Sequence, residues 1–372
     1  MPKYKSLSTT RPYDPYQFLG KEKVFLSTII IGVTLAAFFA GSGAPAMWLG
    51  FAFAAYAAVA NDSIQSLGTF IESNGHRRWW VLWLYIGTIF LCVVTFSWLY
   101  FDGDVTYQRL LDSDGETKYP HPESFSFFQI IAPLVLIVLT RLRMPVSTTF
   151  LLLSVFSADT SGITSVVFKS WSGYAMAFLL SFAVWYFSYK TIRKYFKSRK
   201  HNQAWVVVQW IVSGSLWATW IMQDGANIAV FLPRQQTPTQ FVIFAAVIFA
   251  GLGILFYLRG DKIQRIVSEK VRISDVRAAT LVDFTYVILL IYKLFISTVP
   301  MSTTWVFLGI IGGREIAVSL ARKKNGIKHK KKAIWMTARD FGYAMAGLAI
   351  SVLLAVGANP DIRNTILEAI GF

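Results

Sequence analysis

The sequence predicts an all-α polytopic membrane protein, built as an inverted repeat with two broken-helix hairpins. The first observation is composition: of 372 residues, 55% are hydrophobic and only 15% are charged, against roughly a quarter charged in soluble domains. The second is a series of apolar runs near the length of about 20 residues that a helix needs to cross a bilayer. The third is duplication, because Met-Pro-Val-Ser-Thr-Thr at 144–149 returns as Val-Pro-Met-Ser-Thr-Thr at 299–304.

The apolar runs define the expected spans in order. These cover residues 24–43, 46–60, 79–100, a run that ends near Tyr189, 205–222, 239–258 and 338–357. Two further stretches, 125–160 and 279–320, are interrupted by the repeated motif. In the first of them Pro145 lacks a backbone donor and disfavours helix at the preceding residue. Two half-helices that meet at a polar tip are therefore expected there.

The distribution of charge indicates how the chain crosses the membrane. The formal charge is +16, and the basic residues gather in the loops 190–201, 259–278 and 322–332, whereas the loop 101–124 is acidic. All three basic loops fall in the cytoplasm if each interrupted stretch returns to the side that it left. The amino terminus is then inside and the carboxyl terminus outside. This orientation accounts for the positive charge, so we expect no nucleic-acid partner.

The same count divides the chain into repeats of opposite orientation. We expect a cytoplasmic tail at 1–23, a first transmembrane repeat with an extra amino-terminal span at 24–200, and a second, inverted repeat at 201–372. The first Ser-Thr-Thr then lies on an outward-side hairpin and the second on an inward-side hairpin. Inverted repeats of this kind are typical of alternating access around a site at the bilayer midplane.

The hydroxyl triplets are candidates for anion binding. A serine or threonine after a proline is often only an N-cap, which satisfies free backbone N–H groups at a helix start. Capping requires one hydroxyl, however, and here three stand in a row, twice. Helix N-termini offer N–H donors and partial positive charge that suit an oxyanion. The expected anion ligands are Ser147, Thr148, Thr149, Ser302, Thr303 and Thr304.

Asp62 and Asp224 are candidates for cation binding. Each follows an apolar run, and a carboxylate costs on the order of 2.5–3.5 kcal/mol at the bilayer centre, so it is rarely idle there. Carboxylate and amide oxygens suit a small hard cation such as sodium. The alternatives are a proton on the same carboxylates and snorkelling to the interface. The expected cation ligands are Asn61, Asp62, Gln65, Gln223, Asp224 and Asn227.

We expect no enzyme and no cofactor. The sequence has no phosphate-binding glycine loop with lysine, no cluster of histidine and cysteine at metal-ligand spacing, and no nucleophile with a base at a familiar spacing.

At these residues the chain resembles the inorganic phosphate transporter (PiT-type) family, as a divergent member. That family carries a Gly-Ala-Asn-Asp-x-x-Asn motif and a Pro-Val-Ser-Thr-Thr-His motif in each of two inverted repeats. Residues 60–65 and 223–227 are similar to the first motif, and residues 145–149 and 300–304 to the second. The resemblance implies a homodimer in the cell (plasma or inner) membrane that couples phosphate uptake to sodium, or in some members to protons. It also implies cation binding at the aspartates and amides and anion binding at the hydroxyl tips.

The departures from the family motifs concern the substrate. Phe150 and Trp305 stand where the family has histidine, Gln65 and Gln223 replace asparagine, and Ser154 stands where glycine is expected. A permease for sulfate or another tetrahedral oxyanion, coupled to sodium or protons, is therefore the alternative to a phosphate transporter. A non-transporting membrane sensor or scaffold is a further alternative.

Overall fold

Every regular element in the described part of the chain is a helix. The computed structural model describes residues 22–111, 119–142, 144–198, 203–258, 276–296, 301–321 and 326–369. The expected tail at 1–23 lies almost wholly outside these residues. The elements are α2 (Lys23–Phe39), α3 (Ala44–Ser73), α4 (Trp79–Tyr100), α5 (Phe127–Arg141), η1 (Thr149–Leu153), η2 (Ser154–Phe156), α6 (Thr160–Ser198), α7 (Gln203–Ala229), α8 (Pro238–Tyr257), α10 (Val276–Ile296), α11 (Thr303–Ala321), α12 (Gly326–Ala358) and α13 (Pro360–Ala369).

Eight of the described helices are long and apolar enough to cross a membrane, so the prediction of a multi-pass helical membrane protein is confirmed at that level. They are α3, α4, α6, α7, α8, α10, α11 and α12. Large apolar side chains such as Phe168, Phe187 and Leu353 remain exposed on these helices, as a lipid-facing surface requires. The first expected span, 24–43, is the shorter helix α2, which has 17 residues.

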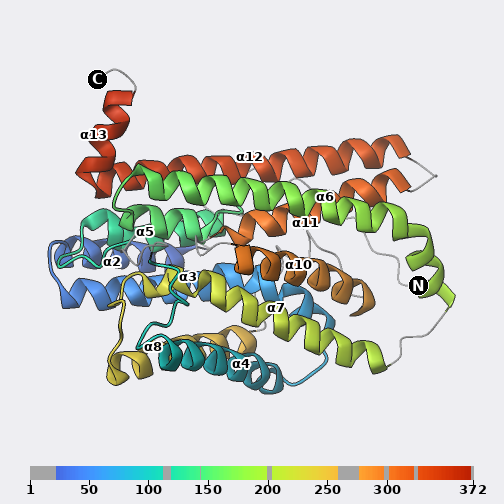
Figure 1. The fold of residues 1–372 in the computed structure, drawn as a ribbon, viewed down its shortest axis with the longest axis horizontal. Coiled ribbons are helices and arrows are strands. Elements are labelled where there is room, and N and C mark those ends of the chain that lie inside the picture. Colours follow the sequence, from blue (N-terminus) through green and yellow to red (C-terminus); the bar gives the residue numbers. More distant parts are fainter. Residues whose placement is uncertain are drawn as a thin grey trace.

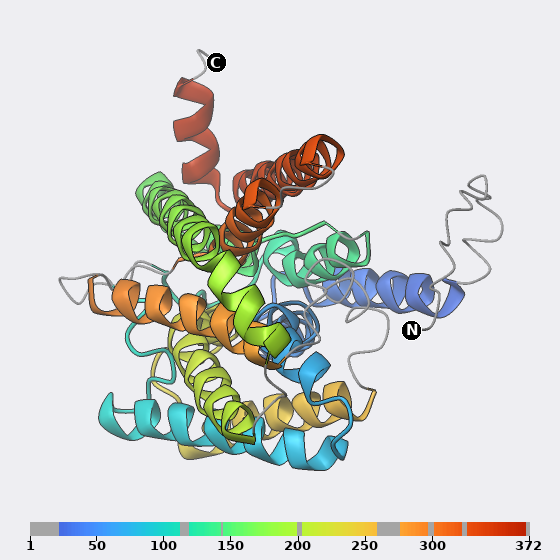
Figure 2. The ribbon, with the colours of Figure 1, turned by 90° about the vertical axis from the view of Figure 1, so that its right-hand side faces the viewer.

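The helices form three layers. Figures 1 and 2 show α6, α11 and α12 along one side and α4 with α8 along the other. Between them lie α3, α7 and α10, with α5 beside α3. The middle layer therefore faces neighbouring helices on both sides, and the expected cation ligands lie within it, on α3 and α7.

Several connections are tied together at one end of the molecule. Gly41 N donates to Phe125 O (2.8 Å), Gln236 N to Gly103 O (2.9 Å), and Asn359 Nδ2 to Ser157 O (3.0 Å). The α2–α3, α4–α5, η2–α6, α7–α8 and α12–α13 connections therefore lie at one end (Figure 1). The described residues of the expected acidic loop belong to this end, whereas the carboxyl end of α6 and the amino end of α7 lie at the opposite end (Figure 1).

Glycines let α11 approach α6 closely. A Cβ on Gly309 would lie 2.5 Å from Tyr174 O, and a Cβ on Gly313 would collide with Phe178 O. These two glycines are four residues apart, the spacing of small residues at which membrane helices pack backbone to backbone. Ser181 Oγ adds a hydrogen bond to Ile310 O at 2.7 Å. The middle of α11 is thus fixed against α6.

The first interrupted stretch is irregular, as expected. Helix α5 ends at Arg141, residues 144–147 are not helical, and the chain resumes as a π-turn (η1) and a 3₁₀ turn (η2). Gln129 Nε2 donates to Val155 O at 3.1 Å, so the stretch ends beside its own beginning. The second stretch differs, because α10 and α11 are each long enough to span. Pro300 lies outside the described residues.

Two helices continue past the ends that we expected for their spans. Asp62 was placed just after a span ending at residue 60, yet α3 continues without a break to Ser73. Its polar last turns are buried rather than solvated, because Ser66, Thr69 and Ser73 lie in the interior and donate to groups within α3 or on α10. Likewise α7 continues past Asp224 to Ala229. Both carboxylates are therefore inside helices. At the carboxyl end, α12 begins earlier than expected and α13 was not predicted.

A glycine-to-alanine change at Gly103 should destabilise the protein. Gly103 has φ +97°, and a Cβ there would meet Gln236 N and O at 3.1 Å. We expect Gly103→Ala to lower the free energy of unfolding by about 1 kcal/mol or more, measured as a lower Tm of the purified protein in detergent. The control is Gly342→Ala on α12, where nothing lies within 4 Å of the added Cβ. Equal Tm values for the two variants would contradict this account.

Candidate functional site

Each of α3 and α7 supplies one buried carboxylate with an amide beside it. Asn61 Nδ2 donates to Asp62 Oδ1 at 2.8 Å on α3, and Asn227 Nδ2 donates to Asp224 Oδ1 at 3.1 Å on α7. Both carboxylates are 1% exposed. Buried charges require partners because their desolvation is expensive. Snorkelling of these aspartates to the membrane surface is therefore wrong.

The first Ser-Thr-Thr lies between the two carboxylates. Thr148 Oγ1 donates to Asp62 Oδ1 at 2.6 Å, and the next residue, Thr149, donates to Asp224 Oδ1 at 3.0 Å. The amides of Asn61 and Asn227 reach the same two hydroxyls, each at 3.2 Å. Two adjacent hydroxyls thus connect α3 to α7, and they bring Asp62 within electrostatic range of Asp224.

The second Ser-Thr-Thr joins this network from the other interrupted stretch. Thr303 Oγ1 donates to Asp224 Oδ2 and accepts from Trp220 Nε1 at 3.2 Å. Thr304 Oγ1 lies 3.5 Å from Val146 O, to which it donates, so the two tips meet directly. Tyr286 on α10 fixes the backbone, because its hydroxyl donates to Thr303 O at 2.8 Å. The asparagines, aspartates and threonines predicted from the duplicated motifs therefore converge in space.

The serines of the two triplets cap the turns that follow them. Phe150 N donates to Ser147 Oγ at 3.1 Å, and Trp305 N donates to Ser302 Oγ at 3.3 Å. The capping interpretation thus holds for the first hydroxyl of each triplet. In this structure the threonines, and not the serines, contact the carboxylates.

Phe150 and Trp305, which occupy the family's histidine positions, contact each other. Their rings meet edge to face, with centroids 5.5 Å apart and an interplanar angle of 89°. Both residues are buried. Each follows its triplet directly, so this aromatic contact closes one side of the meeting point of the tips with apolar surface.

Four buried oxygens of the expected cation ligands accept no hydrogen bond from the residues that the structure describes. They are Asp62 Oδ2, Gln65 Oε1, Gln223 Oε1 and Asn227 Oδ1. Buried polar atoms in native proteins are nearly always satisfied, and each exception calls for an explanation such as an ion or water. Oxygen donors of this kind are ligands of hard cations. The amide of Gln223 donates to Leu290 O (3.2 Å), whereas no described hydrogen bond ties Gln65 to the two carboxylates.

Two buried cations near the site were not singled out from the sequence. Arg109 was counted only as part of the acidic loop, and Lys169 of α6 was not considered, although a lone lysine within an apolar run is a usable signal. They are 4% and 7% exposed. Burial lowers the pKa of Arg109 to about 10, and the charge of Asp224 opposes that shift, so the guanidinium is charged at neutral pH.

A third intramembrane aspartate, Asp283 of α10, is satisfied without a cation. Thr69 Oγ1 donates to its Oδ1 at 2.6 Å, and Ser213 Oγ donates to its Oδ2 at 2.7 Å. Asp283 therefore joins α3, α7 and α10 by hydroxyl bonds alone. On α11, Arg314 and Glu315 form an ion pair with each other.

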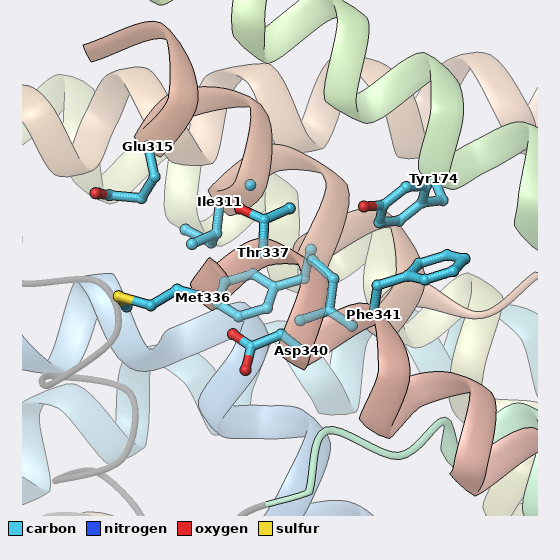
Figure 3. Close-up of a pocket in the computed structure, with 10 residues that line it drawn as sticks. Tyr174, Ile311, Glu315, Met336, Thr337, Asp340 and Phe341 are labelled. Carbon is cyan, nitrogen blue, oxygen red and sulfur yellow. The ribbon is translucent and has the colours of Figure 1, made fainter. Parts of the chain in front are cut away.

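A surface crevice is lined by residues that do not belong to this network. Side chains of α6, α11 and α12 line it, among them Tyr174, Ile311 and Phe341 (Figure 3). Its two carboxylates, Glu315 and Asp340, are each paired with the adjacent arginine. In the part of the chain that the structure covers, no group of three or more histidine, cysteine and acidic residues could hold a metal ion.

Comparison of the chain with protein-family models, with curated proteins and with solved structures finds no match in any of the three. The resemblance to phosphate transporters therefore rests on the paired motifs.

If the unsatisfied oxygens hold sodium, sodium should stabilise the purified protein. A ligand that binds only the folded state stabilises it by about 2.7 kcal/mol at a hundredfold excess over its Kd. We expect a saturable rise in Tm with sodium chloride but not with choline chloride at equal ionic strength. Asp62→Asn should abolish the rise, whereas Asp283→Asn should keep it. A wild-type Tm that does not respond to sodium, or an unchanged response in Asp62→Asn, would count against a sodium site.

Proposed function

We propose that the protein is a secondary transporter that moves inorganic phosphate across the membrane by alternating access, coupled to a sodium gradient. The observation that carries this proposal is the direct contact of both hydroxyl tips with the two helix-borne carboxylates. Thr148 binds Asp62, whereas Thr149 and Thr303 bind Asp224. Groups suited to an anion and groups suited to a cation thus share one buried site.

The shared hydroxyls provide a physical basis for coupling. In this structure the hydrogens of Thr148, Thr149 and Thr303 are donated to carboxylates, so they are not available to an anion. A cation on the carboxylates would satisfy them and release the hydroxyls. It would also remove the repulsion between the carboxylates and a nearby anion. Cation and anion would then favour each other's binding, and the effect is reciprocal by linkage.

Opposed hairpins are the conformational part of the proposal. The stretch from α5 to η2 begins and ends at one end of the molecule, as the contact between Gln129 and Val155 supports, and α10 and α11 lie toward the other end (Figure 1). Helix α3 packs on α5 as α7 packs on α10. These pairings fit two inverted repeats, 24–200 and 201–372, whose tips alternate between open and closed. A homodimer remains an implication of the family resemblance.

Sulfate, or another tetrahedral oxyanion, is the second candidate substrate. The contact between Phe150 and Trp305 favours it, because these rings, unlike the family's imidazoles, have no nitrogen that accepts a hydrogen bond from the P–OH group of hydrogen phosphate. A proton could replace sodium on the same carboxylates.

Uptake into proteoliposomes tests the proposal. We expect labelled phosphate or sulfate to accumulate under an inward sodium gradient and to fall to the level of empty vesicles in Asp62→Asn and Asp224→Asn, because these carboxylates hold the driving ion. Asp283→Asn is the matched control, since it replaces an equally buried carboxylate that the mechanism does not use.

Gel filtration of each variant establishes that the fold is intact. Near-normal uptake in both site variants would overturn the proposed mechanism. Absence of wild-type uptake of either anion, under sodium and under proton gradients, would favour a sensor or scaffold.

A further inference from the structure

The crevice between α6, α11 and α12 has a mostly apolar lining of residues outside the carboxylate network. Its most buried members are Phe307, Leu308 and Ile311 of α11. On the side of α12 it is lined by the half-buried Met336 and Phe341 (Figure 3). An apolar groove at the surface is a binding feature that calls for an occupant, and this lining favours an apolar one.

The surroundings of the crevice indicate which apolar occupant is at hand. Trp335, next to Met336 on α12, is 61% exposed, and Tyr343 is exposed one turn beyond the lining. Helices α6, α11 and α12 are all long and apolar enough to cross a membrane, and they make up one outer layer of the molecule (Figure 2). Exposed apolar side chains on such helices contact lipid chains, so an acyl chain is the expected occupant.

One end of the crevice adjoins two lysines. Met336, Thr337 and Phe341 line the crevice from one face of α12. Lys332 lies four residues before Met336, so it occupies the same face one turn earlier. Lys331 and Lys332 are both exposed. Two positive charges therefore stand at the amino-terminal end of α12, just beyond the apolar lining.

These lysines lie where α12 passes from polar to apolar sequence. Residues 330–332 are all lysine, and the apolar part of the helix begins after them. Trp335 lies within one turn of the lysines, and tryptophan is enriched at the level of the lipid headgroups. Lysines just outside a membrane span attract anionic headgroups. A phospholipid with its phosphate at the lysines thus has the crevice within reach of an acyl chain.

The two carboxylates that line the crevice are paired with arginines. Glu315 pairs with Arg314 at 2.7 Å, and Asp340 pairs with Arg339 at 3.1 Å. Each carboxylate therefore has a positive partner beside it, which reduces its repulsion of an anionic headgroup.

Aromatic contacts connect the crevice to the second hydroxyl tip. Tyr174 and Phe341, which both line the crevice, pack against Trp305 with ring centroids 6.2 Å and 5.8 Å away. Trp305 directly follows the second Ser-Thr-Thr. An acyl chain in the crevice would therefore contact residues that pack against this tip.

We propose that the crevice between α6, α11 and α12 binds an anionic phospholipid, with the phosphate at Lys331 and Lys332 and one acyl chain beside Ile311 and Phe341. The lysines select the charge of the headgroup, and the apolar lining holds the chain. This inference goes beyond the proposed function, because the bound lipid is not transported and its binding does not depend on which anion the protein moves.

Photolabelling of the purified full-length protein in a non-ionic detergent tests this site. The probe is phosphatidylglycerol with a photoactivatable acyl chain, and the labelled residues are mapped by mass spectrometry. We expect adducts within 307–315 on α11 and 336–341 on α12. Unlabelled phosphatidylglycerol should compete about tenfold better than phosphatidylcholine, because two lysines near the headgroup favour a net negative charge.

Two variants separate the headgroup from the acyl chain. The double variant Lys331→Gln and Lys332→Gln removes the charge and should lose most of the preference for phosphatidylglycerol over phosphatidylcholine. Met336→Trp places a larger side chain in the crevice and should remove most of the adducts on α11.

The controls match these changes in chemistry but not in place. Lys190→Gln with Lys194→Gln removes two exposed lysines near the carboxyl end of α6. Ile334→Trp adds the same ring at an exposed position of α12 that does not line the crevice. Both should be labelled like the wild type, and an unchanged Tm in each variant establishes an intact fold.

Three results would overturn the inference. They are adducts spread evenly over all exposed helices, equal competition by the two lipids, and unchanged labelling in both crevice variants. Cross-links that place a second copy of the chain on the crevice would overturn it as well. Because binding is measured without transport, each of these results leaves the proposed function to be decided by the uptake assay.

Discussion

The arrangement of this protein depends on two carboxylates held inside an apolar helical bundle. Such a burial is tolerated only where hydrogen bonds or opposite charge compensate for lost hydration. Here the compensating hydrogen bonds come from two adjacent residues of another segment. Thr148 donates to Asp62, and Thr149 donates to Asp224. Because these two adjacent side chains point to different neighbours, one short stretch can form hydrogen bonds with both α3 and α7.

The local sequence produces this irregular stretch in identifiable steps. Pro145 disfavours helix at the residue before it, Ser147 caps the turn that begins η1, and the π-turn of η1 displaces Thr149 from its ordinary helical position. The bundle makes room for it, because a Cβ on Gly347 of α12 would lie 2.9 Å from Val146 Cγ1. Breaking of the helix, capping and close packing therefore all act at the same point of the chain.

Much of the candidate site could be predicted from the sequence because its two polar motifs each occur twice in the chain. Duplicated polar motifs in apolar runs identify Asp62 and Asp224 without knowledge of their surroundings. The continuation of α3 to Ser73 could not be predicted, because a polar turn is buried only when another helix, here through Asp283, supplies partners. The burial of Arg109 and Lys169 is likewise invisible in the chain, since it results from packing. The opposite membrane orientation of the two repeats and the assembly into a homodimer stay predictions.

The contact between Phe150 and Trp305 has a thermodynamic consequence for any motion of the tips. If the tips separate so that one side becomes open to water, the facing surfaces of these rings become hydrated. Hydration of apolar surface raises the heat capacity. The opening step then has an enthalpy that changes with temperature, and a cycle limited by that step gives a curved Arrhenius plot. A histidine pair at the same positions would expose polar groups and lessen that curvature.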